Sequence, residues 1–252
     1  MNILAFIKRV PDTESRIRIQ HETRTITEDG LNFVVSPYDE YAVEEALRLR
    51  EGKGGNVRVV SVGRDEAVAV LRKSLAMGAD EAFLVKDDAP ESYDGLRTAR
   101  IIARAVERRF AGADLLLFGK QSVGADNSQV PAMVAELLGL PQATVVTKLE
   151  VGDGAATAFR EIEGGTEKVA LTLPAVVTAQ KGLNEPRYAS LPGIMKAKKK
   201  EMAVVGADTL GTDLSPVVKM RKYMAPKERV GGKKVVDVAE LIEKLRSEAK
   251  VL

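Results

Sequence analysis

Short apolar runs alternate with longer amphipathic segments through residues 1–140 of this chain. This alternation is typical of a parallel β-sheet whose strands are joined by helices that cover both of its faces. The expected strands are residues 3–7, 56–62, 82–85 and 115–118, and the expected helices are residues 37–51, 66–77, 96–110 and 131–138. The sequence therefore predicts an α/β fold of the doubly wound, mostly parallel type.

From residue 143 onward the pattern changes to alternating, β-branched segments at 144–151, 155–162, 168–173 and 175–179. We expect these segments to extend the sheet as an antiparallel meander at its edge. After residue 200 the dense periodicity is lost, and it returns only at residues 238–245. The expected organisation is an α/β domain over residues 1–200 and an extended C-terminal arm with a terminal helix over residues 201–252.

Composition removes several classes of chemistry. The 252 residues include no cysteine and a single histidine, His21, which we expect at the surface. Thiolate nucleophiles, iron–sulfur clusters and multi-histidine metal sites are therefore excluded by residue type. Basic and acidic residues number 38 and 36, so the net charge of +2 gives no reason to expect a nucleic acid as partner. Because no apolar run approaches the roughly 20 residues of a membrane span, we expect no membrane insertion. The expected location is the cytoplasm for a prokaryotic source, and an organelle location would need a cleaved or internal signal.

A glycine-containing loop, GKQSVGADNSQ at residues 119–129, follows one expected strand and precedes an expected helix. A loop in this position places backbone N–H groups and the positive end of a helix where a phosphate can bind. Polar side chains at residues 126–129 add further donors and acceptors. No G-x-x-x-x-G-K-[ST] motif occurs, so a bound nucleotide would be structural rather than cleaved. The residues alone fit an ordinary capped turn equally well.

Residues 181–200, KGLNEPRYASLPGIMKAKKK, join a turn-rich and partly apolar loop to a strongly basic helix end. Leu191, Ile194 and Met195 in such a polar surrounding are typical of a recognition surface. The alternative is that these three side chains belong to the core and that the lysines only complement the helix dipole.

Four stretches resemble the electron transfer flavoprotein beta subunit family: FIKRVPD (6–12), SPYDEYAVEEALRL (36–49), GKQSVGADNSQ (119–129) and LNEPRYASLPGIMKAKKK (183–200). The resemblance implies an adenine nucleotide alpha hydrolase-like, Rossmann-like sheet that binds AMP without turnover. It also implies a heterodimer with an alpha subunit that holds most of the FAD, and a C-terminal arm that packs on that partner. Such a subunit is an electron carrier rather than an enzyme. Its donors would be acyl-CoA and other flavin dehydrogenases, and its acceptor an electron transfer flavoprotein-quinone oxidoreductase of the respiratory chain.

The resemblance also carries expected cofactor contacts onto this chain. Tyr38 would lie near the dimethylbenzene edge of the flavin, and Ser36 stands where many relatives carry Asn. The full set comprises Phe6, Ser36, Pro37, Tyr38, Asp39, Val62, Gly119, Lys120, Gln121, Ser122, Val123, Gly124, Ala125, Asp126, Asn127, Ser128, Gln129 and Val130.

In the same way, the resemblance makes Leu191 the anchor that docks into dehydrogenases. The implied partner-recognition residues are Glu185, Pro186, Arg187, Tyr188, Leu191, Pro192, Ile194, Met195, Lys196 and Lys199. Lys196 and Lys199 would steer the surface toward acidic dehydrogenases.

Two other functions remain open from the sequence. A divergent branch of the resembled family binds a second FAD in place of AMP and bifurcates electrons, although Asn127 and the intact LNEPRYASLP favour AMP. A nucleotide-binding module of the universal stress type would share the sheet, and it predicts a self-contained homodimer with exchangeable ATP. A nucleic-acid binder is disfavoured, since aromatic residues make up only 4% of the chain.

Overall fold

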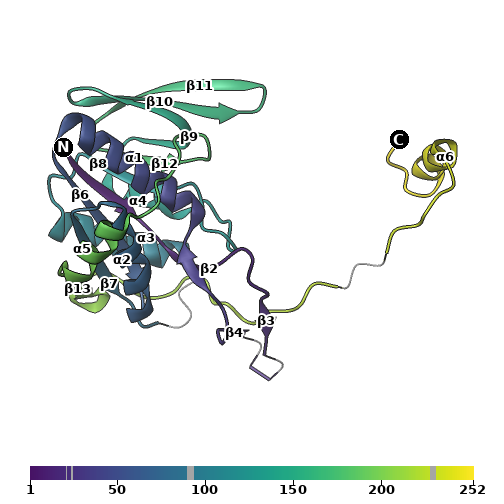
Figure 1. The fold of residues 1–252 in the computed structure, drawn as a ribbon, viewed down its shortest axis with the longest axis horizontal. Helices are drawn as coiled ribbons and strands as arrows, with labels where there is room; N and C mark the ends of the chain where they lie inside the picture. Colours follow the sequence, from purple (N-terminus) through teal and green to yellow (C-terminus); the bar gives the residue numbers. More distant parts are fainter. Residues whose placement is uncertain (21, 24, 90–93, 228–230) are drawn as a thin grey trace. The chain divides into compact units, whose positions relative to one another are not determined.

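The computed structural model describes residues 1–20, 22–23, 25–89, 94–227 and 231–252 (Figure 1). The surface position that we expect for His21 lies outside these ranges. The main feature is a nine-stranded sheet. In sheet order its strands are β11 (Gly165–Thr172), β10 (Ala155–Ile162), β9 (Gln142–Val151), β12 (Ala175–Ala179), β8 (Leu115–Gly119), β1 (Asn2–Phe6), β6 (Asn56–Gly63), β7 (Glu81–Lys86) and β13 (Ala203–Gly206).

Strand β1 lies in the interior of the sheet and pairs in parallel with β6 on one side and with β8 on the other. The chain first builds outward from β1 to β6 and β7, and then crosses to the opposite side of β1 to form β8. The strand order therefore reverses between β1 and β8. This arrangement confirms the predicted α/β, doubly wound, mostly parallel fold.

Five helices pack on the sheet. They are α1 (Pro37–Lys53), α2 (Val68–Met77), α3 (Gly95–Arg109), α4 (Val130–Leu138) and α5 (Leu191–Lys199). Helices α1, α2 and α5 share one hydrophobic core with one face of the sheet, and α3 and α4 share a second core with the other face. Side chains of β1 alternate between the two cores: Ile3 and Ala5 join the first, and Leu4 and Phe6 the second.

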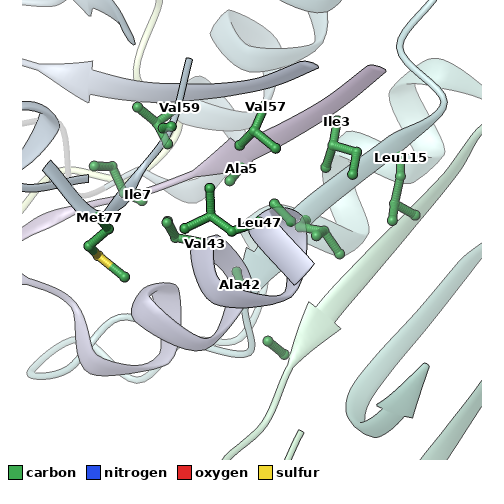
Figure 2. Packing of buried hydrophobic residues seen from close by; sticks show 14 of the residues in the cluster. Ile3, Ala5, Ile7, Ala42, Val43, Leu47, Val57, Val59, Met77 and Leu115 are labelled. Carbon is green, nitrogen blue, oxygen red and sulfur yellow. The ribbon is translucent and has the colours of Figure 1, made fainter. Parts of the chain in front are cut away.

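Helix α1 forms where the sequence predicts it, behind Ser36 at the N-cap position and Pro37 at the first helical position. Asp39 and Glu40 lie in its first turn, and Arg50 and Lys53 lie in its last turn, which complements the helix dipole. Figure 2 shows Val43 and Leu47 of α1 directed toward β1 and β6. Burying Leu47 completely contributes about 1.5–3 kcal/mol to folding, so this contact fixes α1 against the central strands.

The antiparallel meander expected after residue 143 forms from β9, β10 and β11 at one edge of the sheet. The prediction is wrong for the fourth expected segment, residues 175–179. Strand β12 does not extend the meander but lies in parallel between β8 and β9. All five of its residues are buried, because both faces of this interior strand are covered, and an apolar run without alternation is typical of such strands.

The sheet also continues beyond residue 200, where we expected the arm to begin. Strand β13 pairs in parallel with β7, and the short 3₁₀ helix η2 (Ala207–Leu210) buries Leu210 in the core that contains α3. The compact unit that holds the sheet comprises residues 1–17 and 27–221. A second unit comprises residues 18–26 and 222–252, and it contains helix α6 (Val238–Ser247), which the Asp237 side chain caps at Glu240 N.

Small elements complete the description. A 3₁₀ helix, η1 (Asp65–Ala67), precedes α2. Strands β2 (Arg9–Pro11) and β5 (Phe33–Val35) form an antiparallel ribbon, and β3 (Arg18–Ile19) and β4 (Ile26–Thr27) form a second two-stranded sheet. None of the helices in the described ranges combines the length and the apolar character needed to cross a lipid bilayer.

Candidate functional site

The carboxyl ends of β1 and β8 lie side by side at the point where the strand order reverses. In open parallel sheets, ligands bind in the crevice at such a switch point. Phe6 ends β1, Gly119 ends β8 and Val62 lies near the end of the adjacent β6. The structure therefore brings three separate parts of the expected cofactor set to one edge of the sheet. The Phe6 ring itself is buried and stacks on Phe118 with 4.3 Å between the ring centroids.

The Asp39 carboxylate ties the start of α1 to both strand ends. One oxygen accepts a hydrogen bond from the Lys8 amide at 2.7 Å, and the other accepts one from the Gly119 amide at 3.0 Å. Burial raises the pKa of Asp39 to about 7, although these hydrogen bonds and the Lys8 charge oppose the shift. Both carboxylate oxygens of Asp39 are therefore used to join α1 to the two strand ends.

Gly119 has no room for a side chain. A β-carbon at this position would lie 2.6 Å from the carbonyl carbon of Tyr38 and 2.7 Å from the amide nitrogen of Asp39. Only glycine lets the end of β8 approach the backbone of α1 this closely. The glycine that opens the 119–129 loop thus serves close packing at the switch point.

Two buried serine hydroxyls near this edge have no hydrogen-bond partner among the described residues. Ser36 is fully buried at the N-cap position, but its hydroxyl does not cap α1 as the sequence predicts. Ser61 is buried on β6, one residue before Val62. A buried hydroxyl without a partner is costly, so each is a candidate to bind a ligand atom. We did not predict Ser61, although a polar residue inside an apolar strand is a signal for it.

The 119–129 loop is exposed from Gly124 to Gln129 and holds a strained backbone. Asp126 and Ser128 have φ angles of 50° and 51°, in the left-handed region that residues other than glycine rarely adopt. Gln121 bridges both of them: its amide nitrogen lies 2.7 Å from the Asp126 carboxylate, and its carbonyl oxygen accepts from the Ser128 hydroxyl at 3.2 Å. Strain of this kind is typical of ligand-binding loops.

Two lysines add positive charge to the same edge. Lys8 follows β1, and its ammonium donates a hydrogen bond to Ser122 Oγ at 3.3 Å. Burial lowers the pKa of Lys8. Lys120 follows β8, and its ammonium lies 4.9 Å from the centre of the Tyr38 ring. Sequence analysis missed Lys8, although its place directly after the first strand is a usable signal. Together the two ammonium groups suit an anionic ligand.

The remaining loop positions surround these groups. Lys120, Gln121, Ser122, Val123 and Val130 are partly buried. Among the described residues, no side chain caps the start of α4 at Val130, so the positive end of that helix opens onto the loop. Pro37 occupies the first turn of α1 beside Ser36.

A second surface is formed by residues 181–200, hereafter the docking segment. Tyr188 is 97% exposed, Leu191 79%, Met195 59% and Ile194 39%. Leu191, Ile194 and Met195 are therefore not core residues, contrary to the alternative raised from the sequence. Within the same segment, Glu185, Pro192, Lys196 and Lys199 are also exposed.

The backbone beneath these exposed side chains is held firmly. A β-carbon on Gly193 would lie 2.5 Å from Ala76 O, so glycine lets α5 pack directly on α2. Arg72 of α2 donates to the carbonyl oxygens of Ala197 at 2.5 Å and Lys200 at 2.6 Å, which satisfies the C-terminal end of α5. The apolar side chains are thus presented from a rigid helix.

Pro186 and Arg187 differ from the other expected partner-recognition residues. Both are half-buried, and the Arg187 guanidinium is directed toward α1, where it pairs with Glu44 and Glu51. Among the expected partner-recognition residues, the Arg187 side chain thus already forms ion pairs within this chain.

Comparison with known proteins gives a consistent result. A family model described as "Electron transfer flavoprotein domain" matches residues 23–210. The chain is 43% identical to the electron transfer flavoprotein subunit beta of Bacillus subtilis (strain 168), and the alignment covers 100% of each chain. It is likewise 43% identical to the same subunit of Bradyrhizobium diazoefficiens, again with 100% of each chain covered. With the subunit of Mus musculus the identity is 39% over 100% of this chain and 99% of the relative.

Proposed function

The chain belongs to the electron transfer flavoprotein beta subunit family, and on that premise we propose that it binds one AMP without turnover and serves as the beta half of a two-chain electron carrier. Its partner would be an alpha subunit that holds most of the FAD. The observation that carries the AMP proposal is the meeting of Ser36, Gly119 and the 119–129 loop at the switch point between β1 and β8.

The residues at this edge fit a nucleoside monophosphate. The Ser36 hydroxyl is buried and lacks a partner among the described residues. Lys8 supplies a positive charge to the loop, where its ammonium donates to Ser122 Oγ at 3.3 Å. Loop amides after Gly119 and the uncapped start of α4 would bind the phosphate, and the Asn127 side chain would bind through its amide. The loop lacks the G-x-x-x-x-G-K-[ST] motif, so we propose that the nucleotide remains intact.

FAD, when bound, supplies the electron-accepting group, and this chain would cover one side of it. Tyr38 stands at the start of α1 with Lys120 over its ring, and we propose that the ring borders the flavin. Transfer between two flavins needs close approach rather than a protein acid or base. A chain with no cysteine and one histidine fits that role of carrier rather than enzyme.

The docking segment would receive the electron donors. Leu191 is the proposed anchor, framed by Tyr188, Ile194 and Met195, and the surface fits an apolar pocket on acyl-CoA and related flavin dehydrogenases. The proposed acceptor is an electron transfer flavoprotein-quinone oxidoreductase. Helix α6 has no buried residue and exposes Val238, Leu241 and Ile242, and we propose that it packs on the alpha subunit. A prokaryotic cytoplasm is the proposed location.

Nucleotide analysis of the assembled protein tests this proposal. The chain is co-expressed with the alpha subunit of its own source, the complex is purified and denatured, and the released nucleotides are separated and counted. We expect one AMP and one FAD for each pair of chains. Two FAD and no AMP would replace the proposal with a bifurcating carrier, and exchangeable ATP on a colourless homodimer would replace it with a stress-type module.

A further inference from the structure

Arg187 joins the docking segment to α1 through two carboxylates. Its Nε and Nη2 atoms donate to the two oxygens of Glu44 at 2.8 and 2.9 Å. Its Nη1 and Nη2 atoms donate to the two oxygens of Glu51 at 2.5 and 3.0 Å. The Arg187 amide also donates to Glu44 at 3.1 Å. Glu44 and Glu51 lie two helical turns apart and thus on one face of α1.

Asn184 makes a further connection from the same loop to the same helix. Its side-chain nitrogen donates to Glu45 at 3.0 Å and to the carbonyl oxygen of Tyr41 at 3.0 Å. The loop is therefore attached to α1 before and after Pro186, whose fixed φ angle further limits its freedom. The exposed Tyr188 follows this attachment directly.

Burial makes this network stronger than an ordinary surface ion pair. The Glu44 side chain is only 5% exposed, whereas those of Arg187 and Glu51 are 34% and 49% exposed. Paired, two-pronged contacts between guanidinium and carboxylate are directional as well as strong. Hydrogen bonds to Glu51 and then to Glu44 raise the pKa of Arg187, and the hydrogen bond from Arg187 lowers the pKa of Glu51, so both Arg187 and Glu51 stay charged.

The two ends of the exposed apolar surface are held by different helices. Helix α2 holds α5 through Arg72 and the close contact at Gly193, and α1 holds the preceding loop through Arg187. Leu191 is the first residue of α5, so it lies between the two attachments. A side chain that is already held in its docking position loses less conformational entropy when a partner binds.

We propose that Glu44 and Glu51 form a carboxylate clamp on Arg187 that preorganises the docking segment, so that Arg187 is a positioning residue rather than a contact of the partner. The proposal rests on the docking function proposed above for Leu191. A role in fold stability alone would predict lower thermal stability without a specific effect on docking.

The test uses the complete two-chain complex and Arg187→Lys. Lysine keeps the positive charge but cannot bind both carboxylates in a two-pronged way. We expect amide hydrogen exchange to accelerate in residues 185–191. We also expect KM for a purified acyl-CoA dehydrogenase to rise roughly three- to tenfold at unchanged kcat, the range for releasing one restrained side chain. Glu51→Gln, at the more exposed partner, is the milder second variant should Arg187→Lys fold poorly.

A double-variant cycle separates positioning from general stability. If the clamp acts through Leu191, Arg187→Lys raises KM much less in a Leu191→Ala background than in the native one. Arg160→Lys is the matched control, because Arg160 pairs with Glu167 on the β10–β11 hairpin at similar exposure. It should change neither exchange in residues 185–191 nor KM.

The outcomes distinguish the clamp from the docking function. Unchanged exchange in residues 185–191, or equal rises in KM in both backgrounds, would overturn the clamp. If Leu191→Ala leaves KM unchanged while Arg187→Lys still accelerates exchange, the docking function fails and the clamp on the loop stands as a structural restraint only.

Discussion

The Gly119 amide donates a hydrogen bond to the Asp39 carboxylate at 3.0 Å, which joins the end of one central strand to the first turn of α1. The same carboxylate accepts from the Lys8 amide after the neighbouring central strand. A single buried acid therefore sets the geometry of the edge where we place the nucleotide.

This acid makes stability depend on pH. Burial raises the pKa of Asp39 from its ordinary value of 3.8 to about 7, so between these values the folded chain holds a proton that the unfolded chain has released. The contribution of Asp39 to the free energy of unfolding is then fully present below pH 3.8 and is lost as the pH rises toward about 7. We expect the difference between native protein and Asp39→Asn to change by up to about 1.4 kcal/mol per pH unit in this window, measured by urea unfolding. A difference that is constant with pH would contradict the assignment.

Gly119→Ala should disrupt the switch point. The added β-carbon would lie 2.6 Å from the Tyr38 carbonyl carbon, so either α1 or β8 must move, at a cost of about 1–3 kcal/mol. We expect a lower melting temperature and loss of AMP from the purified complex. Gly52→Ala is the control, because nothing lies within 4 Å of a β-carbon there and the residue is inside α1. That control should raise helix stability slightly.

Ser36→Ala separates ligand binding from folding. Since the hydroxyl has no partner among the described residues, its removal should leave the unfolding free energy of the nucleotide-free chain unchanged or slightly higher. AMP affinity should fall roughly tenfold or more if the hydroxyl binds the charged phosphate. Isothermal titration with AMP and urea unfolding give the two quantities. An unchanged affinity would remove Ser36 from the site.

Leu191→Ala should weaken docking without affecting the fold. The side chain is 79% exposed, and burying a leucine against a partner is worth about 1.5–3 kcal/mol, or a factor of tens in affinity. We expect slower reduction of the complex by acyl-CoA dehydrogenase with unchanged FAD content and melting temperature. Ile162→Ala, at an exposed position on the β10–β11 hairpin, should leave the rate unaltered. Equal rates for all three proteins would exclude the anchor.

Lys196 and Lys199 should contribute to the rate of encounter. Both are exposed beside the apolar surface, where they would attract an acidic dehydrogenase over a distance that salt screens. We expect Lys196→Gln with Lys199→Gln to lower the association rate at low salt and to flatten its dependence on ionic strength, as measured by stopped flow. Lys148→Gln with Lys168→Gln, on the meander, is the matched control. If the association rates of the two double variants depended on ionic strength in the same way, Lys196 and Lys199 would have no special role in the encounter.

The sequence predicted the fold correctly where the signal comes from residues that are close together in the chain. The first half of the sheet and its helices follow from hydrophobic periodicity and from helix-start signals such as Pro37, because these act between residues close in the chain. The place of β12 could not be derived, since strand order depends on which faces are covered by elements distant in sequence. The same holds for β13, whose short run carries too few residues for a period.

The same distinction holds for the candidate site, where some residues have a local sequence signal and others do not. Gly119 and the 119–129 loop were found because a loop between a strand and a helix has a local signature. Ser61 was missed because its burial arises only when β1 and β6 pair, and Lys8 because its approach to Ser122 arises only when β1 and β8 pair. The engagement of Arg187 by α1 spans more than 130 positions, and no sequence pattern near Arg187 reports it.

Helix α1 serves both surfaces, since Asp39 lies in its first turn and Glu44 and Glu51 lie further along it. Each residue in an α-helix advances the direction of its side chain by about 100°. One inserted residue between Asp39 and Glu44 would therefore rotate the two clamping acids away from Arg187 while the nucleotide edge kept its place. The spacing between Asp39 and Glu44 therefore fixes how the nucleotide edge and the Arg187 contact are oriented relative to each other. A chain that uses α1 for both must keep that spacing.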